Sequence, residues 1–336
     1  MPDILDLIDP VELTEFARLE AANFDDQVQS YSRFMPYQGV NDIRYAYNKQ
    51  AAAFVDEAVF RAYDAESPTG RRPDSSRIVG EIPAISRKIP LSEYAQLRAR
   101  QAPDRDIIDS IFDDARNLAR GIAARVERAR AIVLETGAIN INENGYQSTY
   151  TSGRHASLTP ADLAGTAVWS DYVNATPISD VIAWADLIRA RVGMSPTELR
   201  VSSTVMAHIQ QCDEVRAFNT AAPLAPQRLS RDRVNDAFVG LAGVRVVVDE
   251  TPAGMTNPRD ATKVILMVDT VPVGRTLYGT PVEASEPDYA GISAQPGIYA
   301  GTWKEKDPVT PWTKAVAITL PVLTIPDATL CCKVIA

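Results

Sequence analysis

Apolar residues recur at three- and four-residue steps over residues 104–135, which predicts one long amphipathic helix. Asp104 or Asp106 is suited to cap its start, and Gly137 stands where a left-handed residue usually ends a helix. At 1.5 Å per residue the helix would be roughly 45 Å long, longer than most helices of globular proteins. We therefore expect a strut. A core helix of an all-α bundle is the alternative, but no neighbour of matching length is found. The apolar stripe comprises Ile108, Ile111, Phe112, Ala115, Leu118, Ala119, Ile122, Val126, Ala129 and Val133.

The N-terminal region predicts a short helix followed by an extended arm. Asp9 is a good N-cap, Pro10 suits the first helical position, and Glu12 follows at the third residue. Residues 27–48 keep no hydrophobic period, which predicts extended chain with a helical patch.

Residues 50–91 predict a two-legged β projection. The outgoing leg, residues 53–63, is rich in strand-forming residues, and residues 67–74 have the composition of a turn. Pro83 and Pro90 remove backbone donors from the return leg, which indicates an edge strand. Two strands alone are marginal in water, so this projection needs a partner surface, such as one on another copy. Deletion of residues 54–85 is then expected to leave a folded subunit that has lost its contacts with other copies. An ordinary surface hairpin is the alternative.

The rest of the chain predicts a hairpin, an α/β unit and C-terminal strands. Residues 138–148 alternate around Asn144–Gly145, a hairpin signal. The α/β unit begins near Pro177, and its apolar strands predict a sheet covered on both faces. Alternation over residues 316–322 predicts a half-buried strand, followed by a closing one. The predicted elements of the α/β unit and the closing strand are helices at 179–192, 203–218 and 231–241, the last capped by Ser230, and strands at 199–202, 244–248, 263–268 and 330–335. The fold class is α+β.

Composition narrows the possible functions. The 336 residues carry a formal charge of -9 with a pI near 4.9, which argues against a general binder of nucleic acid or anionic membranes. Acidic residues dominate the first thirty positions. The cysteines Cys212, Cys331 and Cys332 form no C-x-x-C pair, so we expect a reducing compartment. No apolar run is long enough to cross a bilayer, and no leader is evident, so a cytoplasm is the expected place of synthesis.

Motifs for catalysis are missing from the sequence. Neither His155 nor His208 has the Cys or carboxylate spacing of a zinc site, and no phosphate loop or nucleophile elbow occurs. Cys212 is better explained as a small core residue than as a nucleophile. The four tryptophans are scattered, and core packing explains them best. We expect no enzyme, no cofactor and no metal.

The order of elements resembles the HK97-like shell fold of tailed bacteriophages. The chain resembles in particular the lambda-type major capsid protein E family. The likeness is carried by Ile82–Pro83, by residues 88–97 leading into the long helix and by the hairpin at 137–150. It continues in residues 205–219, which resemble paired helices of the axial domain, and in residues 317–322 and 326–327, which resemble the last peripheral strand and tail.

The resemblance implies a division into five parts. Residues 1–48 would be an N-terminal arm and residues 49–91 an extended loop. Residues 92–150 would form the peripheral domain with spine helix 104–135, residues 151–289 the axial domain with its connections, and residues 290–336 the return to the peripheral domain.

The resemblance also implies a major capsid protein that self-assembles into hexamers and pentamers of an icosahedral shell around double-stranded DNA. Expected partners are many copies of itself, a portal, a scaffold or protease, and a decoration protein, without sequence-specific DNA binding and without a membrane. The location would be the virion, after assembly in the host cytoplasm. No Lys lies between Lys49 and Lys88, so cross-linking from the loop tip is not expected. The expected inter-subunit contacts are Phe54, Phe60, Pro68, Gly70, Arg71, Arg72, Ile82 and Ile85.

Three alternatives stay open at this stage. An encapsulin-like nanocompartment has the same fold but encloses cargo protein. A soluble α/β enzyme would remain small and bind a metabolite, whereas a phage tail protein would form rings or tubes.

The acidic charge of the subunit also fits a shell that encloses DNA. Acidic residues that faced the inner wall would repel the packed DNA.

Overall fold

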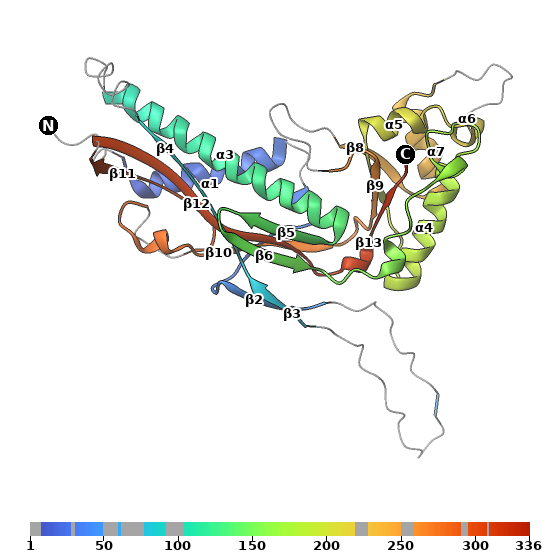
Figure 1. Ribbon diagram of the computed structural model, residues 1–336, viewed down its shortest axis with the longest axis horizontal. Helices are drawn as coiled ribbons and strands as arrows, with labels where there is room; N and C mark the ends of the chain where they lie inside the picture. The colour runs from blue at the N-terminus through green and yellow to red at the C-terminus, as the bar shows by residue number, and fades with distance from the viewer. Residues whose placement is uncertain are drawn as a thin grey trace.

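The computed structural model describes residues 8–27, 31–49, 60–61, 77–91, 104–218, 228–249, 259–289, 295–307 and 309–336. These residues form an elongated molecule with two bodies, one built on a five-stranded sheet and one on a four-stranded sheet (Figure 1). The long helix α3 lies along the first body and ends beside the second.

Helix α3, Asp104–Thr136, confirms the predicted strut. From Ile111 onward the predicted stripe is buried, apart from the partly buried Phe112, while the opposite face carries charged residues. Gly137 adopts a φ of 71° and its N–H donates to the Val133 carbonyl at 2.8 Å, as expected of a left-handed cap. The Arg154 guanidinium adds two bonds, to the carbonyls of Leu134 and Glu135 at 2.6 and 2.9 Å. The carbonyls at this helix end are therefore well satisfied.

The N-terminal helix is longer than predicted. Helix α1 spans Pro10–Gln27, and the Asp9 carboxylate accepts the Val11 N–H at 2.9 Å. It packs along α3 and the strand β11, so the first part of the chain belongs to the first body and is not only an extended arm. Glu20 pairs with Arg120 at 2.9 Å and Asp25 with Arg130 at 2.9 Å. Some acidic residues of this region therefore fix α1 to α3.

The five-stranded sheet joins segments far apart in the chain. The strand β12 is its centre: it pairs antiparallel with β10, β11 and β4, and β1 adds parallel to β10. The described part of β4 pairs with β12 alone, which fits the predicted edge character of the return leg. The strands are β1 Tyr37–Gly39, β4 Ala84–Pro90, β10 Gly274–Gly279, β11 Ile298–Lys306 and β12 Val309–Leu323.

The prediction of a half-buried strand at residues 316–322 was wrong. Residues 315–323 are all buried. Ala315 and Ala317 face α1 and α3, whereas Val316 packs on the other side against Ala284 and Tyr289. The small alanines admit the helices on one face, and a distant segment covers the other. Alternation between small and large residues was thus mistaken for alternation between exposed and buried ones.

The second body confirms the predicted α/β unit. Its sheet has the order β13-β9-β7-β8, and β7 is buried along its whole length. The Ser230 hydroxyl accepts the Arg233 N–H, and Gly243 ends the following helix with a φ of 68°. The elements are α4 Pro177–Val192, β7 Glu198–Ser202, α5 Ser203–Ile209, α6 Asp213–Phe218, α7 Arg231–Ala242, β8 Arg245–Asp249, β9 Lys263–Met267 and β13 Thr329–Lys333.

Two strands lie in a different body from the one predicted. β10 belongs to the first sheet, although residues 151–289 were expected in the axial domain. β13 pairs with β9 in the second sheet, although residues 290–336 were expected to return to the peripheral domain. Both strands are short, and the sequence of a short strand carries no local signal for its partner. The chain therefore crosses between the bodies more often than the linear division implies.

Two ribbons and several short helices complete the fold. The hairpin of β5 Ala138–Glu143 and β6 Tyr146–Thr151 turns at Asn144 and Gly145, with φ values of 50° and 81°. The ribbon of β2 Arg44–Asn48 and β3 Arg77–Glu81 extends from the lower edge of the molecule in Figure 1. The short 3₁₀ helices are η2 Tyr31–Arg33, η3 Ala156–Leu158, η4 Gly165–Ala167, η5 Val282–Ser285 and η6 Pro326–Ala328.

Candidate assembly surface

The β2–β3 ribbon is anchored firmly at its base. The Tyr47 and Tyr150 hydroxyls lie 2.6 Å apart, and the Leu323 N–H donates to Tyr150 at 2.8 Å. Burial raises the pKa of both phenols, that of Tyr47 to about 12. Lys49 Nζ donates to the Gly153 carbonyl at 2.6 Å. Because Asn48 pairs with Arg77, the segment between them leaves and returns at neighbouring positions on this rigid base.

The predicted contact residues fall into three groups. Phe60 is fully exposed. Ile82 is 6% exposed and lies in the core of its own subunit, so its prediction as a contact is wrong: this side chain packs inward where the ribbon meets the body. Ile85 is half-buried against the cluster beneath α3. The predicted contacts that lie outside the described residues are Phe54, Pro68, Gly70, Arg71 and Arg72.

Helices of the second body expose large apolar side chains that the sequence analysis did not single out. Ile182 and Leu187 of α4 are 40% and 38% exposed, and Val239 and Leu241 of α7 about half. Phe218, at the end of α6, is exposed as well. Several such residues on neighbouring helices are typical of a surface that meets another protein.

A buried ionic network joins the two bodies. The Glu198 carboxylate is 1% exposed and is bound by Arg33, Arg200 and Arg245 at 2.6 to 2.7 Å. Burial favours a raised pKa for Glu198, but the three guanidinium groups outweigh it and hold the pKa below its usual range. Arg200 also binds Asp249 at 2.9 Å, and the Tyr31 hydroxyl donates to the same carboxylate at 2.6 Å. The sequence analysis missed this network.

A cavity of about 580 Å³ opens beside this network. It lies between β8 and α7, with Met206 and Val246–Val248 providing apolar lining. Arg33, Arg231 and Arg245 contribute positive charge, and Asn235 and Asp232 are also present. Asn235 accepts the Val246 N–H at 2.9 Å, which covers part of the free edge of β8.

The titratable groups of the described residues fit a structural role. Burial raises the pKa of Cys212 and Cys332 to about 12 and that of Cys331 to about 11, so these thiols are not activated as nucleophiles. Cys212 is fully buried, which confirms its prediction as a core residue. His208 stacks on Tyr172, and burial lowers its pKa. Within the described ranges, no group of His, Cys, Asp and Glu suits a metal, and no helix is apolar and long enough to span a membrane.

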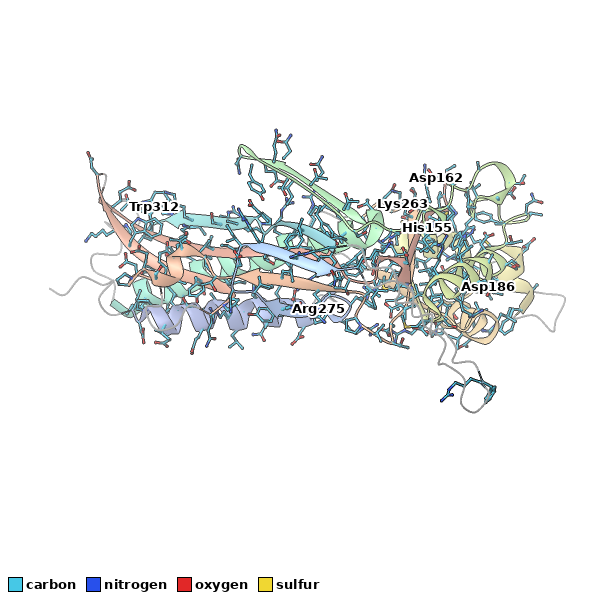
Figure 2. All side chains as sticks on the ribbon, turned by 90° about the horizontal axis from the view of Figure 1, so that it is seen from below. His155, Asp162, Asp186, Lys263, Arg275 and Trp312 are labelled. Carbon is cyan, nitrogen blue, oxygen red and sulfur yellow. The ribbon has the colours of Figure 1, made fainter. Side chains whose placement is uncertain are left out.

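The tryptophans pack in two pairs. Trp169 and Trp184 stack in the second body at 5.9 Å between ring centroids. Trp303 and Trp312 form a cross-strand pair at the far end of the first sheet, and Lys88 Nζ lies 4.0 Å from the Trp312 ring centroid. Figure 2 shows Trp312 and Asp186 at opposite ends of the molecule.

Comparison with known proteins identifies the family. Residues 55–334 match the family model described as phage major capsid protein E. The chain belongs to this family. It is therefore a bacteriophage major capsid protein and a component of the virion shell, in a family of structural proteins. No curated protein sequence matches the chain.

Solved structures show the same HK97-like fold at low sequence identity. A phage-related protein from Bordetella bronchiseptica RB50 has a TM-score of 0.60 at 14% identity, with 94% of this capsid protein and 95% of that chain covered. The proposed capsid protein of an Escherichia coli CFT073 prophage has a TM-score of 0.57 at 18% identity, covering 78% and 80%. The satellite phage P4 procapsid, a structure that includes a size-determination protein, matches with a TM-score of 0.52 at 8% identity, with 94% of this capsid protein and 90% of that chain covered. At such identities the likeness shows the fold alone.

Proposed function

We propose that this capsid protein assembles into hexamers and pentamers that close an icosahedral shell around double-stranded DNA. The observation that carries the proposal is the family match over residues 55–334, joined to a subunit whose β2–β3 ribbon extends away from both cores. Assembly would take place in the host cytoplasm. A portal, a scaffold or protease, and a decoration protein are the further partners that such a shell would use.

We also propose that residues 49–76 contact a neighbouring subunit. The ribbon supports this because it exposes Val79 and leads to the fully exposed Phe60. The base of the ribbon is held by its own subunit through Tyr45 and Tyr47. Its exposed side, which carries Val79, gains little from that subunit, so we propose that contacts with a partner stabilise it. Ile82 is excluded from this contact set because its own subunit buries it.

The structure sharpens the deletion that tests the loop. Removing residues 54–85, as the sequence suggested, would delete β3 and the buried Ile82 and would damage the core. Replacing residues 49–76 by Asn-Gly instead joins the paired residues Asn48 and Arg77 through a two-residue turn. A matched variant keeps the length but replaces residues 50–76 by a Gly/Ser linker.

Both variants are expected to fold and to form no closed particles. Circular dichroism and thermal unfolding check the subunit, while sedimentation and negative-stain microscopy, with neighbouring structural genes co-expressed, check assembly. Normal particles from either variant would refute the role of the loop. Wild-type particles that contain protein cargo instead of DNA would favour the encapsulin-like alternative.

A further inference from the structure

Helix α1 covers a backbone edge of the first sheet. In an antiparallel pair, residues whose N–H and C=O groups bond to the partner strand alternate with residues whose groups point away. The Thr14 hydroxyl accepts the Ala300 N–H at 3.2 Å and lies 2.9 and 2.8 Å from the Ala300 and Tyr289 carbonyls. Arg18 Nε donates to the Ile298 carbonyl at 2.9 Å. These backbone groups of β11 thus point away from β12, and α1 binds them where a further strand would pair.

One face of α1 makes both contacts. Thr14 and Arg18 are four residues apart, which places them side by side on a helix. Thr14 is 3% exposed and Ala300 is fully buried, so water does not replace these bonds. The Arg18 guanidinium also lies 4.8 Å from the centroid of the Tyr299 ring. Figure 2 shows α1, the pale blue helix, running along the sheet of the first body.

The sequence of β11 gives its edge little protection. Residues 298–303 read Ile-Tyr-Ala-Gly-Thr-Trp, a run that favours strand and carries neither charge nor proline. An uncovered strand of this kind is a template for pairing with another chain. The strand β4 differs, since it carries Arg87, Lys88 and Pro90, and such residues make an edge unsuitable for pairing. β11 therefore depends on α1 for the protection that β4 has in its own sequence.

We propose that α1 guards this edge, and that β11 pairs with the β11 edge of a second copy when α1 is released. A second copy is the favoured partner because the two edges are identical and uncharged over residues 298–303, so no charge opposes their approach. Antiparallel pairing about a two-fold axis would match the donors of each strand with the acceptors of the other. The guard, residues 10–27, lies outside the residues 55–334 that match the family model.

Replacing one hydroxyl by a methyl group tests the guard. Thr14→Val keeps the side-chain shape and removes the acceptor of the Ala300 N–H. Deleting α1 would be less informative, because it would also uncover apolar side chains of α3 such as Ile111. In hydrogen exchange followed by mass spectrometry, peptides covering residues 298–303 should exchange about tenfold faster in Thr14→Val than in the wild type. Thr329→Val is the matched control, because it removes a fully buried hydroxyl that donates to the Pro326 carbonyl in the second body. It should leave exchange at β11 unchanged.

Association of particle-free subunits is the second measurement. Thr14→Val combined with Arg18→Met should raise the dimer fraction in sedimentation at least about tenfold above the wild type, and infrared spectra should show an intermolecular sheet band. Adding Thr302→Lys puts a charge into the released strand and should restore the wild-type distribution. Unchanged exchange and unchanged sedimentation overturn the guard. Faster exchange without dimers, or association without the intermolecular sheet band, overturns pairing with a second copy.

Discussion

Arg130 of α3 offers a direct test of how the first body is held together. Its side chain is 3% exposed and binds Asp25 at 2.9 Å, Glu127 at 3.1 Å and the Thr276 hydroxyl at 3.0 Å. Burial lowers the pKa of Arg130, but Asp25 and Glu127 outweigh it and raise the pKa above its ordinary value. Arg130→Met keeps most of the side-chain volume and removes the charge.

The expected loss follows from what the substitution leaves behind. Glu127 is 4% exposed, and the Tyr31 N–H donates to it at 2.7 Å. Removing one partner of a buried ion pair costs about 3–5 kcal/mol, because the buried charge that remains loses its counter-charge. The loss of the pair with Asp25 adds less to this cost, because the Asp25 side chain is 23% exposed and can reach water. We expect a loss of about 3 kcal/mol in the free energy of unfolding, and partial recovery when Glu127→Met is added.

Urea unfolding of the unassembled subunit, followed by circular dichroism, measures these differences. Arg125→Met is the matched control on the same helix, because both side chains of its 2.7 Å pair with Glu143 reach solvent, at 29% and 59% exposure, and such a pair is worth about 0–1 kcal/mol. Equal losses from Arg125→Met and Arg130→Met would refute the reasoning, since burial would then not determine the effect.

Two further predictions concern Glu198 and the end of α3. Because the folded pKa of Glu198 is lowered, its contribution to stability is present above the unfolded carboxyl pKa of about 4.3 and is lost as pH falls through the lowered value. In urea unfolding at a series of pH values, Glu198→Gln should therefore have a lower free energy of unfolding than the wild type at neutral pH. Between pH 5 and 3 its free energy of unfolding should fall less than that of the wild type. The same pH dependence in both proteins would contradict this. Gly137→Ala should lower the free energy of unfolding by about 1–2 kcal/mol, because φ is 71° and the new Cβ would lie 3.1 Å from Ser152 Oγ. Gly121→Ala lies inside α3 with open space around the added carbon and should raise it by about 0.5–1 kcal/mol. Thermal unfolding measures both changes, and equal effects would contradict the argument.

The sequence predicted the elements whose signals are local. The stripe along α3, the Asn144–Gly145 turn and the Ser230 cap each depend on residues within a few positions of one another, and the structure confirms all three. The order of elements then carried the resemblance to the capsid family, which the comparisons confirm.

The partners of the strands were beyond such reasoning. β10 and β13 exchange bodies relative to the prediction, because the sequence of a short strand does not specify which distant strand it pairs with. The ionic network around Glu198 was missed for a related reason. Arg33 comes from η2, Glu198 from β7, and Arg245 and Asp249 from β8, and no spacing in the sequence relates these three segments. Only the pair Glu198 and Arg200, two residues apart on one strand, gave a local signal.

The segment around Tyr31 shows what those distant residues join within the subunit. Its backbone N–H donates to Glu127 of α3, and its hydroxyl donates to Asp249 of β8, so one residue binds both bodies. The Arg200 guanidinium lies 4.6 Å from the centroid of the Tyr31 ring and fixes it further. Arg33, two residues on, binds Glu198 of β7 and also lines the cavity between β8 and α7. A substitution that removes the Tyr31 or Arg33 side chain is therefore expected to weaken the contact between the two bodies.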